Sequence, residues 1–123
     1  SVQFTTDVKQ IALGNCILEV SISPIDAVKI SNDSNMAFLD ADKIQEPLTW
    51  RYWQAGDRFY PLGMSTQKNV SDLLTDAKVP LHEKEQQGVL LSGDAIVWVI
   101  GQRVDNRYRI TAETKKVLLL TRN

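Results

Sequence analysis

The sequence is poor in the residues that most often carry out chemistry. It contains a single cysteine, Cys16, and a single histidine, His82. One cysteine cannot form an intramolecular disulfide, and one cysteine far from one histidine lacks the spacing of a zinc site. Because Cys16 lies in the apolar run CILEVSI, we expect a buried, unreactive thiol. That expectation fits a reducing, cytoplasmic location.

Motifs for phosphate chemistry and for nucleophilic catalysis are also missing. The chain has neither G-x-x-x-x-G-K-[ST] nor G-x-G-x-x-G, and no strained G-x-S-x-G elbow. His82 follows Pro80 closely and is interpreted as a surface residue. A hydrolase would require a polar pocket that joins His82 to a serine and an aspartate. The sequence therefore disfavours an active site and predicts no metal or cofactor in this chain.

Long apolar runs are absent as well. No stretch approaches the roughly 18–20 apolar residues of a membrane span, and the segment SVQFTTDVKQ does not have the pattern of a signal peptide. We therefore expect no membrane association.

The net charge of −1 hides an uneven distribution. Residues 1–49 carry three lysines and seven acidic residues, whereas residues 50–123 carry eleven basic and eight acidic residues. The segment from Arg103 to Arg122 contains six basic residues and only two acidic ones. A local basic surface attracts a polyanion even on a neutral domain, although charged strand faces are often simply solvated.

Hydrophobic periodicity predicts several strands and two short helices. We expect strands at 16–23, 36–40 and 48–53, a hairpin over 88–101 that turns at 92–94, and two strands within 107–122 on either side of 112–114. Short helices are expected at 71–78 and 81–87. The predicted fold class is α+β, with mostly antiparallel, β-sandwich-like layers. Residues 1–47 are interpreted as leading strands of the same domain as residues 48–123.

The stretch GDRFYPLGMSTQKNVSDLLTDAKVP, residues 56–80, is the most specified part of the chain. Ser71 has the character of a helix N-cap, Val70 is placed to pack on Leu74, and Pro80 prevents continuation. Glycines and a proline shape the loop before this helix, between Arg58 and Lys68. A helix N-terminus beside a lysine favours an anion such as phosphate.

Alternatives remain for several of these side chains. Arg58 either faces a ligand or forms a structural ion pair with Asp57 or Asp76. Trp53 and Tyr60, together with Tyr108, offer aromatic surface beside basic residues. The alternative for Trp53, and for Phe59, is a place in the core.

These residues also carry a family resemblance. Residues 48–121 resemble the C-terminal domain of bacterial tRNA(Ile)-lysidine synthetase, whose pattern is R-x-x-x-x-G-D-R-F-x-P-x-G-M, K-x-x-S-D, D-x-K-x-P and I-x-W-V-x-G-x-R. The matching residues are Arg51, Gly56, Asp57, Arg58, Phe59, Pro61, Gly63, Met64, Lys68, Ser71, Asp72, Asp76, Lys78, Pro80, Ile96, Trp98, Val99, Gly101 and Arg103. The segment STQKNVSD keeps only Lys68 where the family often has paired lysines.

The resemblance implies a layered α+β fold similar to one in the phenylalanyl-tRNA synthetase β subunit. It also implies a role in holding the acceptor stem of a tRNA(Ile) with a CAU anticodon. An N-terminal PP-loop domain of the same longer chain would use ATP, with magnesium, to convert the wobble cytidine to lysidine. The implied RNA-binding residues here are Arg58, Lys68, Lys78 and Arg103, with Arg51, Arg107 and Arg109 as further candidates.

A second hypothesis comes from a different class of function. The domain would be a docking module that packs on the catalytic part of its own chain or on a second subunit, including a second copy in a homodimer. Aromatic anchors dominate protein interfaces. Trp50, Tyr52 and Trp53 on an exposed edge would favour this hypothesis, as would basic residues scattered over the surface.

Overall fold

The computed structural model describes residues 1–123. Its elements in chain order are β1 (Val2–Phe4), β2 (Gln10–Leu13), β3 (Cys16–Pro24), the 3₁₀ turn η1 (Ile25–Ala27), β4 (Met36–Asp40), η2 (Ala41–Lys43), β5 (Leu48–Tyr52), β6 (Arg58–Phe59), β7 (Lys68–Asn69), α1 (Val70–Asp76), α2 (Leu81–Lys84), β8 (Gly88–Ser92), β9 (Ala95–Val99), β10 (Arg103–Val104), η3 (Asn106–Tyr108) and β11 (Lys116–Arg122). Neither helix has the length and apolarity needed to cross a membrane.

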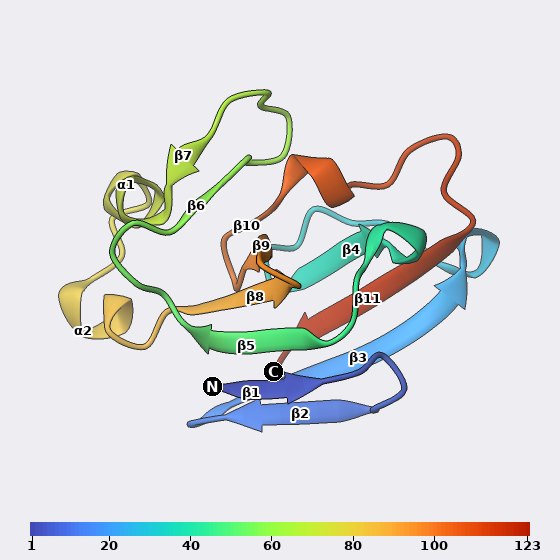
Figure 1. Ribbon diagram of the computed structural model, residues 1–123, viewed down its shortest axis with the longest axis horizontal. Helices are drawn as coiled ribbons and strands as arrows, with labels where there is room; N and C mark the ends of the chain where they lie inside the picture. The colour runs from blue at the N-terminus through green and yellow to red at the C-terminus, as the bar shows by residue number, and fades with distance from the viewer.

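Two antiparallel sheets make up most of the molecule (Figure 1). One has the strand order β1-β5-β8-β9-β10 and the other the order β2-β3-β11-β4, while β6 and β7 form a separate two-stranded ribbon. In the second sheet, β11 pairs with β3 on one side and with β4 on the other. The predicted α+β class with antiparallel, sandwich-like layers is confirmed.

The first hydrophobic core fills the space between the two large sheets. Leu18 of β3, Leu39 of β4 and Leu118 of β11 come from one sheet, and Leu48 and Trp50 of β5 come from the other. All five side chains are buried. Alternation along each strand sends every second side chain to this core.

The second hydrophobic core lies on the other face of the β1-β5-β8-β9-β10 sheet. Phe59 of β6, with Val70 and Leu74 of α1, packs against Val89 of β8 and Val99 of β9. The predicted strand within 95–100 is therefore buried on both faces, which explains its continuously apolar sequence. Of the two alternatives for Phe59, a place in the core is confirmed.

A β-bulge interrupts the pairing of β8 with β9. Leu90 pairs with Trp98, but the next residue, Leu91, pairs with Ile96, so Val97 has no partner on β8. The carbonyl of Val97 instead accepts a hydrogen bond of 2.8 Å from the backbone N–H of Asp105. Bulges free backbone groups in this way and often lie beside functional loops.

The first helix begins one residue earlier than the sequence predicts. Asn69, not Ser71, occupies the N-cap position, and no side chain caps the helix. Val70 is the first helical residue, where its N–H donates to the carbonyl of Asp57 at 2.9 Å. The helix ends at Asp76, and Lys78 adopts a left-handed φ of 56°. The second helix, expected over 81–87, ends at Lys84.

The prediction of two strands within 107–122 is wrong for the first of them. Residues 106–108 form the turn η3, and only β11 is a strand. The alternation in RYRI suggested a strand, but the side chain of Asp105 accepts from the backbone N–H of Arg107 and bends the chain. Local capping by an aspartate competes effectively with strand formation.

Two leucines near α1 and α2 give a direct test of the second core. Leu74 is fully buried, whereas Leu81 is 74% exposed. We expect Leu74→Ala to lower the free energy of unfolding by about 2–5 kcal/mol, because it leaves a cavity. The control Leu81→Ala should change it by less than about 0.5 kcal/mol. Urea unfolding measures both, and equal losses would contradict the second core.

Candidate nucleic-acid interface

The β6–β7 ribbon lies against the segment formed by β10 and η3 (Figure 1). The N–H of Leu62 donates to the carbonyl of Val104 at 3.1 Å, and the N–H of Asn106 donates to the carbonyl of Tyr60 at 2.6 Å. The N–H of Gly63 donates to Oδ1 of Asn106 at 3.0 Å. The two basic stretches of the sequence, around 58–68 and 103–109, are therefore joined by backbone hydrogen bonds.

The carboxylate of Asp105 holds this junction together. Asp105 is completely buried and accepts from the N–H of Tyr60 at 2.9 Å and from the N–H of Arg107 at 2.8 Å. The guanidinium of Arg107 adds two more hydrogen bonds, of 3.0 and 3.1 Å. These bonds to Asp105 raise the pKa of Arg107 above its ordinary value. The guanidinium of Arg107 therefore serves to hold the buried carboxylate of Asp105.

A second arginine–aspartate pair fixes the loop between β5 and β6. Arg51 donates to both carboxylate oxygens of Asp57, at 2.9 and 3.0 Å, and the N–H of Gln54 donates to the same carboxylate at 2.7 Å. Burial alone would raise the pKa of Asp57, but the hydrogen bonds from Arg51 and Gln54 and the charge of Arg51 lower it below its ordinary value. The hydrogen bonds that Arg51 donates to Asp57 in turn raise the pKa of Arg51.

Lys68 and Arg58 project from the ribbon with different partners. Lys68 forms an ion pair of 2.5 Å with Asp76 at the end of α1. Nε of Arg58 donates to Oδ1 of Asn69 at 3.0 Å. Since Asp57 binds Arg51 and Asp76 binds Lys68, Arg58 forms neither of the ion pairs considered from the sequence. Arg58 is exposed and keeps its terminal amino groups available.

Three other candidate cations are exposed with little or no internal pairing. Lys78 follows α1 and forms no ion pair within the chain. The guanidinium of Arg103 donates to the carbonyl of Leu62, and Nη1 of Arg109 donates to the carbonyl of Asn106 at 2.8 Å. Carbonyl contacts orient a guanidinium without neutralising it. Among the candidate RNA-binding residues, these three and Arg58 are the ones without an ion pair inside the fold.

The aromatic residues do not form an exposed edge. Trp50 is only 2% exposed, and Nε1 of Trp53 donates to the carbonyl of Lys84 at 2.7 Å while its ring packs on the second core. Of the three proposed anchors, only Tyr52 is exposed, at 42%. An exposed edge of Trp50, Tyr52 and Trp53 would have favoured the docking hypothesis, but Trp50 is buried and Trp53 is half-buried against the second core.

Tyr60 and Tyr108 lie around Arg107 rather than facing outward as free platforms. The guanidinium carbon of Arg107 is 4.6 Å from the ring centroid of Tyr60 and 5.6 Å from that of Tyr108. Such cation–π contacts add to the ion pair with Asp105. These contacts hold η3 against the β6–β7 ribbon.

Three positioning residues were not predicted from the sequence: Asp105, Asn106 and Asn69. Each contributes a side-chain oxygen that accepts from a neighbouring loop or arginine. The order Asp-Asn-Arg over 105–107 is a signal for a capped turn, since Asp and Asn accept from backbone N–H groups two residues ahead. Asn69, whose side-chain oxygen accepts the hydrogen bond from Arg58, has no comparable signal in the sequence.

Comparison with known proteins identifies the family. A family model described as "TilS substrate C-terminal domain" matches residues 48–120. The chain belongs to this family. It is 50% identical over 91 residues to a tRNA(Ile)-lysidine synthase of Parabacteroides distasonis and 31% identical over 91 residues to one of Clostridium acetobutylicum. Those alignments cover 74% of this chain but only 21% and 20% of the relatives, so the chain spans about a fifth of their length.

Solved structures agree with the fold of the TilS C-terminal domain. A crystal structure of a TILS C-terminal domain superposes with a TM-score of 0.84 at 19% identity, covering 99% of this chain and 95% of that one. An N-terminal fragment of the phenylalanyl-tRNA synthetase beta-subunit from Pyrococcus horikoshii gives a TM-score of 0.60 at 18% identity, covering 72% and 28%. The resemblance seen in the sequence is confirmed, and the first of these structures consists almost entirely of this domain.

The lowered pKa of Asp57 predicts a pH-dependent contribution to stability. Its carboxylate is more acidic in the folded than in the unfolded chain, so pairing with Arg51 stabilises the fold above the unfolded pKa of about 4 and is lost as pH falls through the folded pKa. We expect Asp57→Asn to cost about 1.5–3 kcal/mol at pH 7. In urea unfolding, this difference from wild type should shrink below pH 4. A difference that stays constant down to pH 3 would contradict the pairing.

Removing the carboxylate of Asp105 should be more damaging. Asp105→Ala leaves the guanidinium of Arg107 and the N–H of Tyr60 without their acceptor, and we expect a loss of about 3–5 kcal/mol in the free energy of unfolding. Asp94→Ala, in the exposed turn between β8 and β9, is the matched control and should be nearly neutral. Hydrogen exchange of the Tyr60 amide should also accelerate, and unchanged protection there would refute the role given to Asp105.

Proposed function

We propose that this chain is the non-catalytic, tRNA-binding C-terminal domain of a tRNA(Ile)-lysidine synthetase. In this proposal it holds the acceptor stem of a tRNA(Ile) with a CAU anticodon. The N-terminal PP-loop domain of the longer chain then converts the wobble cytidine to lysidine with ATP and lysine. Family membership and the name shared by the longer relatives support this assignment. The full protein would act in the cytoplasm.

One structural observation carries the proposal. The β6–β7 ribbon and the β10–η3 segment are locked together, and exposed arginines project from both: Arg58 from the first, Arg103 and Arg109 from the second. A double-stranded RNA stem is recognised mainly through its shape, phosphates and 2′-hydroxyls. That recognition requires cations at fixed positions and does not require a nucleophile.

The ion pairs divide the candidate RNA-binding residues into two groups. Arg51 and Arg107 are bound to Asp57 and Asp105, so we propose that they position the loops rather than contact RNA. Lys68 is paired with an exposed aspartate and is able to exchange that partner for phosphate. The proposed direct contacts are Arg58, Lys78, Arg103 and Arg109.

The docking hypothesis keeps one supporting observation. Leu62 and Met64, in the loop of the β6–β7 ribbon, are 41% and 38% exposed. Exposed apolar side chains at a loop tip suit contact with another domain of the same chain or with a second subunit. A folded domain that binds no RNA would favour this second function.

The first test is a titration of the domain against two RNAs. An acceptor-stem minihelix and an anticodon-stem hairpin of equal length are compared at low and moderate salt. We expect weak, micromolar binding that prefers the acceptor helix and falls as salt rises, because phosphate contacts release counterions. Equal binding to both RNAs would contradict acceptor-stem recognition.

Substitution of single cations tests the assignment of contacts. Arg58→Ala should reduce affinity severalfold and lower the slope of log K against log salt by about one. Lys29→Ala, an exposed lysine in the acidic part of the chain, is the control and should leave both unchanged. In the full-length enzyme, Arg58→Ala should raise KM for tRNA and leave kcat largely intact. A fall in kcat at unchanged tRNA affinity would count against a binding role.

A further inference from the structure

A cavity of about 480 Å³ opens between the 30–35 loop and the β10–η3 segment. Its lining is mainly apolar and comes from β4, the ribbon loop, β10 and the chain after η3. Its seven apolar lining residues are Trp98 of β9 together with Ile30, Met36, Phe38, Leu62, Val104 and Ile110. The volume lies within the roughly 300–1,000 Å³ of typical small-molecule sites.

Two of the available arginines line the same cavity. Arg103 and Arg109 are both exposed, and carbonyl oxygens of Leu62 and Asn106 orient their guanidinium groups. Asp33 is the one acidic residue in the lining, and its Oδ1 already accepts from the N–H of Asn35 at 2.9 Å. The lining therefore carries one more positive than negative charge and suits an anionic ligand with an apolar part.

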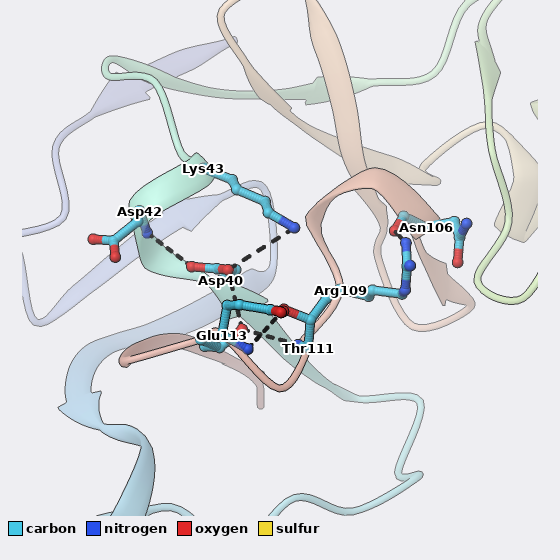
Figure 2. A network of polar contacts seen from close by, with 8 residues as sticks. Asp40, Asp42, Lys43, Asn106, Arg109, Thr111 and Glu113 are labelled. Carbon is cyan, nitrogen blue, oxygen red and sulfur yellow. Dashed lines mark hydrogen bonds and ion pairs between the residues drawn. The ribbon is translucent and has the colours of Figure 1, made fainter.

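The wall that carries Arg109 is fixed to the second sheet. Figure 2 shows Asp40, at the end of β4, beside the loop that follows Arg109. Oγ1 of Thr114 donates to the buried carboxylate of Asp40 at 3.0 Å and accepts from the N–H of Thr111 at 2.9 Å. Lys43 lies 3.9 Å from the same carboxylate. This wall of the cavity is therefore held by hydrogen bonds that need no ligand.

We propose that this cavity binds one unpaired nucleotide of the RNA that the domain holds. The inference rests on the proposed function and makes it more specific. The base would enter the apolar cavity, and its phosphate would contact Arg103 and Arg109. A paired base within a helix cannot enter, so the nucleotide comes from a single-stranded end or an extruded position. An apolar peptide side chain would leave both arginines unused, and inorganic phosphate would leave the apolar walls unused.

The polar lining predicts a preference among bases. Asp33, together with Ser31 and Ser34, places oxygen acceptors in the lining. Carboxylates accept hydrogen bonds from exocyclic amino groups, as in contacts to cytosine N4. Adenine, cytosine and guanine carry such an amino group and uracil does not. We therefore expect uridine to bind least well.

The test compares an RNA helix with and without a single-stranded end. Three versions of the acceptor-stem minihelix are titrated: blunt, with four adenosines at the 3′ end, and with four adenosines at the 5′ end. The variant Ile30→Glu places a negative charge in the cavity at a side chain that is 50% exposed. Its matched control is Ile22→Glu, at a 43% exposed isoleucine of β3 outside the cavity.

We expect the wild type to bind one extended helix at least about fivefold more tightly than the blunt helix, as for stacking of a single base. Ile22→Glu should keep this ratio, and Ile30→Glu should reduce it to about one. Because both variants add the same charge, the ratio isolates the cavity. Methyl NMR signals of Ile30, Met36 and Ile110 should shift with the extended helix, and amide spectra check that each variant is folded.

Equal affinity of the wild type for blunt and extended helices would overturn the nucleotide site while leaving acceptor-stem binding intact. A ratio that survives equally in both glutamate variants would also overturn it. Failure to bind any helix would refute the proposed function. In that event, a titration with adenosine monophosphate tests separately whether the cavity binds a nucleotide. Shifts of the methyl signals of Ile30 and Ile110 would support the site, and their absence would overturn it.

Discussion

The arrangement of the basic loops depends on one buried carboxylate, that of Asp105. Removing a charge from water costs several kcal/mol unless hydrogen bonds replace its hydration. Here four donors do so, and they come from two separate segments, the ribbon residue Tyr60 and the turn residue Arg107. The bulge at Val97 supplies the carbonyl that holds the backbone of Asp105. Loss of any of these groups would loosen the contact between the two basic segments.

Basic residues in this fold serve two physical roles. Arg51 and Arg107 donate to partly or wholly buried aspartates and set the shape of the loops. Arg58, Arg103 and Arg109 donate only to uncharged oxygens, so their charges are not neutralised. A count of basic residues in the sequence merges these roles. The role of each arginine depends on whether an aspartate lies next to it in the folded chain, as Asp57 lies next to Arg51 and Asp105 next to Arg107.

Much of the fold was predictable, and the failures have identifiable causes. The hairpin over 88–101, with its buried second strand, has a strong local pattern, and the alternative that placed Phe59 in the core is the correct one. The segment after Asp105 was misassigned because alternation in RYRI is a weaker signal than an aspartate that caps the next turn. At the candidate site, the structure brings together the two basic segments that the sequence singled out. It did not distinguish Arg58 from Arg107, because their partners come from tertiary contacts.

The position of β11 has a consequence for how the domain forms. This strand, Lys116–Arg122, lies between β3 and β4, which precede it by many residues. The acidic first part of the chain therefore has no complete sheet until the basic last part arrives. Contacts between segments so distant in sequence slow folding, because a long loop must close before they form. During synthesis, the β2-β3-β11-β4 sheet would therefore be completed only after residues 116–122 have been made.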